Sequence, residues 1–205
     1  MQVKSLKSKL ARGKVTLGSW ITLAHPAVAE IMSRAGFDWL AIDLEHSVIT
    51  IREAEELIRV VELSGVSPLV RLSVNDPVQI KRVMDAGSHG VIVPMVNSVS
   101  GAKQAVEAVM YPPQGKRGVG LARAQGYGST FESYRQWLNQ ERVIIVQAEH
   151  IEAVDNLEQL VNGMVKKDHG LIVELNEKIV SRAQWREQPV AEGDKIELIS
   201  FVGGG

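Results

Sequence analysis

Polar and ionisable residues recur at the ends of successive short apolar runs in this chain. The set consists of Asp43, Glu45, His46, Arg71, Gln147 and Glu149. The runs are "FDWLAIDL", "SPLVRL" and "RVIIVQAE". If they form parallel strands of an α/β barrel, their carboxyl ends share one face, which is where active sites form in that fold. Each residue alone has a structural explanation, such as a helix cap or a surface ion pair, but their recurrence favours a site.

These residue types permit one specific kind of chemistry. A carboxylate beside a histidine makes a general base near neutral pH, because the acid orients the imidazole and stabilises its protonated form. An arginine offers a bidentate fork to a substrate carboxylate. A glutamate with a neighbouring glutamine and water suits Mg²⁺ or Mn²⁺. Together they suggest the enolisation of a 2-oxo acid.

The elements that would position these residues alternate between strands and helices. Apolar runs at 15–21, 37–44, 67–72, 90–95 and 142–149 predict strands, and most are separated by segments of helical period. Thr50 and Glu53 have the spacing of a capping box, and Gly65 closes the helix that follows. Between Tyr111 and Arg142 the alternation stops, and we expect a long irregular loop with a functional role.

Composition excludes several classes of protein. The 205 residues are 45% hydrophobic and 23% charged, with a formal net charge of -1 and no cysteine. Scattered charges give no basic surface for nucleic acid and no polybasic membrane anchor, and no apolar run is long enough to span a bilayer. The absence of cysteine excludes disulfides and thiolate chemistry. We expect a cytoplasmic protein without nucleic-acid or membrane partners.

Several stretches resemble the metal-dependent (class II) pyruvate aldolases of the HpcH/HpaI type. They include "AGFDWLAIDLEHS", "VRLSVNDPVQIKRVMDAGSHGVIVPMV", "YPPQGKRGVGLARA" and "VIIVQAEHIEAVDNLEQL", within residues 15–160. The resemblance implies a TIM-type barrel that cleaves 4-hydroxy-2-oxo acids to pyruvate and an aldehyde. By position it implies that His46 and Asp43 form the catalytic base pair, Arg71 and Gln147 contact substrate, and Glu149 binds the metal.

The resemblance breaks down after residue 160. The family's next strand ends in a Gly-Pro signature with a second metal carboxylate, whereas this chain has "GLIVELNEKIV". Without a gap, Glu177 falls at the position of that carboxylate. Too few residues follow Leu175 to complete an eight-stranded barrel of about 250 residues. We therefore expect an incomplete barrel.

The last part of the chain resembles a different family, the ThiS sulfur-carrier protein of thiamine synthesis. The stretches "LIVELNEKIVSRAQW", "EGDKIELISF" and the terminal "GGG" follow that family's order. The resemblance implies a partial β-grasp (ubiquitin-like) segment. It also implies that the carboxylate of Gly205 becomes a thiocarboxylate, with an adenylating enzyme and a thiazole synthase as partners. Terminal glycines can enter a narrow partner site without steric conflict.

The predicted organisation is an α/β protein with two parts, residues 1–165 as the aldolase-like (β/α) barrel portion and 166–205 as the ThiS-like segment. The first functional hypothesis is a carbon–carbon lyase that acts on a 2-oxo acid. The alternatives are a sulfur carrier or an inactive hybrid of the two. Exposed sheet edges of an incomplete barrel favour a homo-oligomer.

The junction carries a structural prediction of its own. We expect 171–175 and 195–202 to pair in a small β unit, because the Gly193-Asp194 turn directs the second run toward the first. The alternative is that 170–175 forms a sixth parallel strand. A unit of so few strands is marginal alone, so we expect it to pack on the barrel portion through Ile179 and Trp185.

Overall fold

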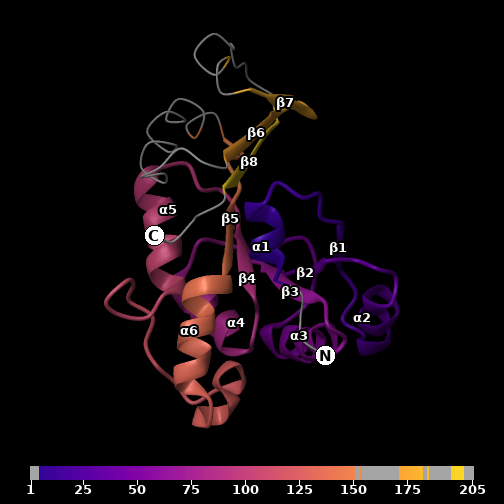
Figure 1. The fold of residues 1–205 in the computed structure, drawn as a ribbon, viewed down its shortest axis with the longest axis vertical. Helices are drawn as coiled ribbons and strands as arrows, with labels where there is room; N and C mark the ends of the chain where they lie inside the picture. Colours follow the sequence, from indigo (N-terminus) through magenta and orange to yellow (C-terminus); the bar gives the residue numbers. More distant parts are fainter. Residues whose placement is uncertain (1–4, 151–152, 154–170, 182–183, 185–194, 201–205) are drawn as a thin grey trace.

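A parallel sheet of five strands lies at the centre of the chain, in the order β1-β2-β3-β4-β5 (Figure 1). The computed structural model describes residues 5–150, 153, 171–181, 184 and 195–200. The strands are β1 (Gly18–Ile21), β2 (Trp39–Asp43), β3 (Ser67–Arg71), β4 (Gly90–Val93) and β5 (Val143–Val146). The sequential order and parallel pairing confirm the predicted α/β array of five strands. Within the described residues, β1 and β5 are the two edges of this sheet.

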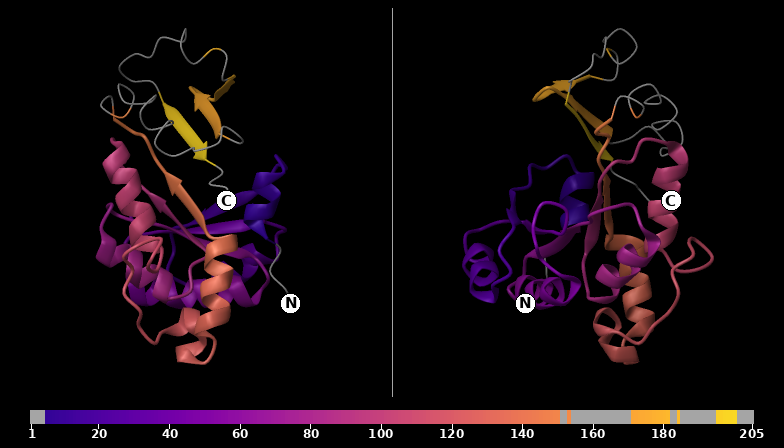
Figure 2. Two further views of the ribbon diagram at one scale, coloured as in Figure 1. Left: turned by 60° about the vertical axis from the view of Figure 1, so that its left-hand side comes forward. Right: turned by 180° about the vertical axis from the view of Figure 1, so that it is seen from behind.

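Helices connect successive strands and cover one face of the sheet (Figure 2). Helix α3 shows how local sequence sets their limits. The Thr50 hydroxyl accepts from the Glu53 amide, and the Glu53 carboxylate accepts from the Thr50 amide, so the predicted capping box is confirmed. Gly65 adopts φ 83° just after the helix, a conformation that favours glycine. The helices are α1 (Leu6–Ala11), α2 (Pro26–Ser33), α3 (Ile51–Leu63), α4 (Pro77–Asp85), α5 (Val99–Val109), the 3₁₀ segment η1 (Arg123–Gly128) and α6 (Phe131–Glu141).

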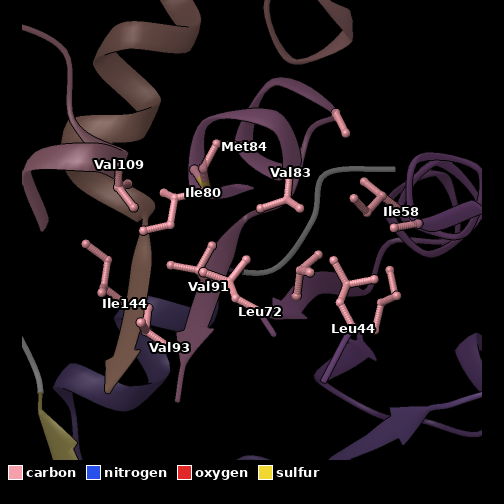
Figure 3. Close-up of a cluster of buried hydrophobic side chains, with 14 of the residues drawn as sticks. Leu44, Ile58, Leu72, Ile80, Val83, Met84, Val91, Val93, Val109 and Ile144 are labelled. Atoms are coloured by element: carbon pink, nitrogen blue, oxygen red, sulfur yellow. The ribbon is translucent and has the colours of Figure 1, made fainter. Parts of the chain in front are cut away.

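The two faces of the sheet bury different side chains. Between sheet and helices lies the larger core, where Val91, Ile144 and Val93 meet Ile80 and Met84 (Figure 3). On the opposite, inner face, Leu6 of α1 packs with a smaller cluster. That cluster contains Ala41, Leu69, Ile92 and Val143. Side chains alternate along each strand, so residues two apart share a face. Asp43 and Arg71 therefore lie on the inner face, two positions after Ala41 and Leu69.

The expectation of an irregular loop from Tyr111 to Arg142 is wrong in its second half, which forms α6. Tyr134 and Leu138 are one helical turn apart and both are buried against the outer core. The spacing was present in the sequence, but the surrounding Gly, Pro and Arg residues obscured it. The first half of the segment follows α5. It therefore runs along the edge of the sheet where the strands begin, opposite the edge formed by their carboxyl ends.

A second, antiparallel sheet of three strands in the order β7-β6-β8 lies beyond the carboxyl end of β5 (Figure 1). Its strands are β6 (Leu171–Leu175), β7 (Lys178–Val180) and β8 (Ile196–Ser200). Leu171 pairs with Ser200 and Leu175 with Ile196, which confirms the predicted pairing of the two runs for the described residues and shows that it is antiparallel. The alternative, a sixth parallel strand, is excluded for β6.

The turn between β6 and β7 explains the position of Glu177. Leu175 pairs with Lys178, and the two residues between them have positive φ values of 50° and 64°. Those values define the turn that matches the twist of a two-residue hairpin. Asn176 also accepts a 2.9 Å hydrogen bond from the Lys195 amide through its side chain. Glu177 is therefore an exposed turn residue rather than the last residue of a parallel strand.

Other predictions about the carboxyl-terminal part have mixed outcomes. Ile179 is 73% exposed, so the expectation that it packs on the barrel portion is wrong. Of the strands in this sheet, β8 contacts β5, and β7 lies two strands away from β8, on the side away from the parallel sheet. Trp185, Gly205 and most of the join near residue 165 lie outside the described residues, so the domain boundary stays a prediction. None of the helices in the described part of the chain has the length and apolar character to cross a bilayer.

Candidate functional site

Asp43 and Arg71 form the centre of the candidate site at the carboxyl edge of the parallel sheet. The register of β2 and β3 pairs them directly. Arg71 donates from Nε to Asp43 Oδ1 at 2.9 Å and from Nη2 to Asp43 Oδ2 at 2.6 Å. This is a bidentate contact, the strongest geometry for such a pair. Two predicted site residues are therefore brought together by strand register.

The Asp43 carboxylate accepts four hydrogen bonds. Besides Arg71, the backbone amides of Glu45 and His46 donate to its Oδ1 at 3.0 and 3.2 Å. Burial alone would raise the pKa of Asp43, but the hydrogen bonds from Arg71 and these amides outweigh burial and hold the pKa below its ordinary value. The hydrogen bond to Asp43 in turn raises the pKa of Arg71. Asp43 is therefore ionised at neutral pH and orients the guanidinium.

The Arg71 guanidinium keeps part of its donor set free. Asp43 occupies the Nε and Nη2 side, and the Trp20 ring lies 4.4 Å from the guanidinium carbon, as in a cation–π contact. The nearest group on the other side is Glu45, whose Oε2 is 3.4 Å from Nη1. An arginine has five N–H donors, so its outer Nη1 and Nη2 groups can still donate hydrogen bonds to a carboxylate ligand.

His46 lies in the loop after β2, and its side chain is 71% exposed. Its Nε2 is 3.8 Å from Glu45 Oε2, whereas its contact with Asp43 is made by the backbone amide. The structure thus places His46 beside both carboxylates, with the ring facing Glu45. The role of His46 and Asp43 as a base pair stays a prediction.

Glu149 and Gln147 lie at the end of β5 and are joined to the loop after β4. Met95 donates its amide to Glu149 Oε2 at 3.1 Å, and Gln147 Nε2 donates to Glu149 Oε1 at 3.4 Å. Met95 has φ 53°, a left-handed conformation that is unfavourable for a residue with a side chain. Strain of this kind is common at functional sites. Glu149 also acts electrostatically on Arg71, so these residues share one edge of the sheet.

The donors at this edge fit part of a hard-cation site. Glu149 offers a carboxylate, and the buried amide oxygen of Gln147 accepts no hydrogen bond from a described residue. Magnesium commonly takes one or two carboxylates and completes its shell with water and substrate oxygens. Within the described ranges, no three acidic or histidine side chains gather into a metal cluster. Among the described residues, Glu149 and Gln147 could therefore supply only part of the ligand shell of such a cation.

Two contributors to the site were not identified from the sequence. Trp20 pairs with Ala41, and Ala41 pairs with Leu69, so the three side chains lie on the inner face. Arg71 follows Leu69 by two residues on the same face, and its guanidinium lies over the Trp20 ring. Alternation along the first strand could have placed Trp20 there. Met95 ends one of the apolar runs that predict strands, but nothing in the sequence predicts that its backbone amide donates to Glu149.

The fold and this site define a class. The chain belongs to the HpcH/HpaI aldolase/citrate lyase family, whose model matches residues 16–173. It is 43% identical over 159 residues to a 4-hydroxy-2-oxovalerate aldolase of Novosphingobium aromaticivorans, covering 77% of this chain and 60% of the relative. It is 41% identical over 152 residues to a 2-dehydro-3,6-dideoxy-6-sulfogluconate aldolase of Pseudomonas putida, covering 74% and 59%.

A solved structure agrees with this assignment. An HpcH/HpaI aldolase/citrate lyase family protein from Burkholderia cenocepacia J2315 superposes with a TM-score of 0.71 at 32% identity, covering 77% of this chain and 64% of that chain. The chain spans about three fifths of the length of the curated relatives it matches.

Proposed function

We propose that this chain is a carbon–carbon lyase of the 4-hydroxy-2-oxo acid (pyruvate) aldolase type, built on part of a TIM-type barrel. The observation that carries the proposal is Arg71, whose Nε and Nη2 donate to Asp43 while its Nη1 makes no hydrogen bond to a described residue. A planar fork at the end of a parallel strand is suited to the carboxylate of a 2-oxo acid. The names of the relatives support the same reaction class.

Each residue of the site has a role in this proposal. Arg71 binds the carboxylate of pyruvate, and Asp43 keeps the guanidinium oriented. Gln147 offers polar contacts beside the substrate. His46 takes a proton from C3 of pyruvate during enolisation and returns one in the reverse direction, because an imidazole can exchange protons near neutral pH. Its exposed position leaves room for a substrate to approach.

We propose Mg²⁺ or Mn²⁺ as the cofactor, with Glu149 and the amide oxygen of Gln147 as protein ligands. Such a cation, when bound, withdraws electron density from the keto group and so makes C3 more acidic. The residues of the chain contribute orientation and proton transfer. Glu149 is held in place for this role by the Met95 amide.

Proton exchange is the direct test of the proposed function. The full chain is incubated with pyruvate and Mn²⁺ in deuterated water, and loss of methyl protons is followed by NMR after removal of the metal. We expect exchange faster than with metal alone, slower exchange for His46→Gln, and no change for Arg59→Ala, which removes a surface ion pair with Glu55. Exchange at the metal-only rate would contradict the proposal and favour an inactive hybrid.

A sulfur carrier is the second candidate, and the described β6–β8 pairing with its Asn176 turn is the observation in its favour. In this reading, Gly205 receives sulfur after adenylation, and an adenylating enzyme and a thiazole synthase are partners. After incubation with such an adenylating enzyme, ATP and a sulfide source, one oxygen of the Gly205 carboxylate should be replaced by sulfur. The intact mass should rise by the difference between the two atoms. An unchanged intact mass would exclude it.

Assembly and location follow from the same proposals. We propose a homo-oligomer, because the edge strands β1 and β5 pair with no further strand of the described residues and another chain can cover them. A cytoplasmic location is a separate proposal. Light scattering at several protein concentrations tests the oligomer, and a clean monomer would contradict it.

A further inference from the structure

A cavity of about 910 Å³ lies at the amino edge of the parallel sheet, away from the candidate site at the carboxyl edge. It is bordered by α1, by α6 and by the residues at which three strands begin, Ser67 of β3, His89 before β4 and Val143 of β5. Its volume is within the range of sites that bind small molecules. The proposed lyase does not use it, because active sites in this fold lie at the carboxyl ends of the strands.

Several polar groups that line this cavity have no hydrogen-bond partner among the described residues. His89 is 8% exposed, and its Nε2 lies 3.4 Å from Glu62 Oε1, whereas its Nδ1 bonds to no described residue. The same holds for the indole N–H of Trp137 and the hydroxyl of Ser67. A polar group that loses water without gaining a partner is unfavourable. These groups are therefore available to a polar ligand.

Two packed aromatic rings hold the Trp137 indole in place. The centroids of Trp137 and His89 are 4.8 Å apart at 57°, and the Tyr134 ring stacks on Trp137 at 5.8 Å and 20°. Tyr134 is itself buried, and its hydroxyl accepts a 3.0 Å hydrogen bond from Arg117. An indole fixed in this way offers an apolar surface to the C–H groups of a ligand.

The two carboxylates that line the cavity each have a cation of the chain nearby. Glu62 accepts a hydrogen bond from Arg123 Nη2. Burial and the charge of Arg142 lower the pKa of Lys7, whereas Glu141 acts in the opposite direction, so a lysine also lies near this second carboxylate. The charges around the cavity therefore balance, and they favour neither an anionic nor a cationic ligand.

We propose that this cavity binds a neutral polyhydroxy compound, a sugar or a polyol, against Trp137. Each hydroxyl group both donates and accepts, so one such molecule can donate to the Glu141 carboxylate and accept from the Trp137 indole N–H. Its C–H groups pack on the aromatic surface. An apolar ligand would leave the N–H and hydroxyl groups of the cavity without partners. The inference goes beyond the proposed function and does not depend on it.

Indole ¹H–¹⁵N NMR on the full chain tests the site, because Trp137→Phe assigns the Trp137 signal. The probes are three matched pairs, D-glucose and D-glucuronate, D-glucitol and the N-methyl-D-glucamine cation, and myo-inositol and cyclohexanol. We expect at least one neutral polyhydroxy compound to shift the signal saturably, with a dissociation constant on the order of 1 mM. Its charged or apolar counterpart should bind about tenfold more weakly. The inference is overturned if no neutral polyhydroxy compound shifts the signal, or if the counterpart binds equally well.

Variants of the lining residues test the placement of the ligand. Glu141→Gln removes the charge that accepts from a hydroxyl and should weaken binding about fivefold to tenfold, whereas Glu132→Gln on the exposed face of α6 is the matched control and should bind as the native chain does. Ser67→Ala should weaken binding several-fold, and it replaces Glu141→Gln in the test if the melting temperature shows that the latter is unfolded.

Binding that is equal in these variants and in the control would overturn the inference. A shift of the Trp20 signal, assigned by Trp20→Phe, without a shift of Trp137 would place the compound at the carboxyl edge and would also overturn it. None of these measurements requires lyase activity. A chain that exchanges no protons of pyruvate therefore refutes the proposed function and leaves this test intact.

Discussion

Two arginines in this chain have similar surroundings but lie in different parts of the molecule. Arg71 contacts Asp43 at 2.6 Å and the Trp20 ring at 4.4 Å, and Arg117 contacts Asp85 at 2.6 Å and the Tyr111 ring at 4.7 Å. Arg71 ends a strand at the carboxyl edge of the sheet. Arg117 belongs to the loop after α5, at the amino edge.

The difference between them is the number of donors left free. The Arg117 side chain is 0% exposed, and its Nε and Nη2 bind Asp85 while Nη1 donates to the Tyr134 hydroxyl at 3.0 Å. Burial would lower the pKa of Arg117, but Tyr134 and Asp85 outweigh burial and raise it. The Arg71 side chain is 14% exposed, and its Nη1 makes no hydrogen bond to a described residue. A carboxylate and an aromatic ring beside an arginine therefore do not distinguish a binding arginine from a structural one. The number of N–H donors that remain without a partner does distinguish them.

Replacement of Arg117 should have the largest effect on stability. Arg117→Met leaves the Asp85 carboxylate without its cation. Loss of one member of a buried ion pair costs about 3 to 5 kcal/mol. Urea unfolding measures the change in the free energy of unfolding. Arg135→Met, on the exposed face of α6, is the control and should change it by less than about 1 kcal/mol. Similar losses for both would refute the anchoring role.

Replacement of Arg71 should instead affect binding. In the proposed lyase, Arg71→Ala removes charge-assisted hydrogen bonds to the substrate carboxylate, which contribute about 1.5 to 3 kcal/mol, or roughly 10- to 150-fold in the pyruvate requirement. Arg71→Lys should restore little, because a lysine cannot reproduce the fork. Pyruvate titration of deuterium exchange measures both. A lysine variant with the native requirement would show that charge alone suffices.

The Asp43–Arg71 pair should also influence acid stability. The pKa of Asp43 is lowered in the folded protein, so its stabilising contribution is present at neutral pH and is lost as the pH falls below about 4, the ordinary value for aspartate. The stability difference between the native chain and Asp43→Asn should therefore shrink as the pH falls through this range. Urea unfolding from pH 7 to pH 3 measures it. A difference that is constant with pH would contradict the linkage.

The smallest expected effect concerns a residue near the site that has a structural role only. Thr50 begins α3 four residues after His46, and Thr50→Ala should lower the free energy of unfolding by about 1 kcal/mol through loss of the cap. Thr50→Ser keeps the hydroxyl and should be nearly neutral. Exchange rates should be native in both variants, and a rate loss in Thr50→Ser would show that the loop after β2 depends on this residue beyond its cap.

The sequence alone determined those features that depend on local pattern. Apolar runs separated by helical periods predicted the five parallel strands, and the Thr50–Glu53 spacing predicted the start of α3. The pairing of β6 with β8 also followed from β-prone runs and turn residues. These features depend on the steric preferences and the burial of a few neighbouring residues. The pattern of residue types in a single sequence shows both. The order of strands then brought Asp43 and Arg71 to one edge.

The tertiary structure decided which side chains at that edge meet. Register pairs Asp43 with Arg71, and the loop geometry then turns the His46 ring toward Glu45, although the sequence made Asp43 an equally good neighbour. Strand position decided that Ile179 is exposed in spite of its apolar side chain. Such outcomes depend on the few ångströms that separate competing partners, because hydrogen bonds and ion pairs weaken steeply with distance and geometry. Spacing along a chain does not contain those distances.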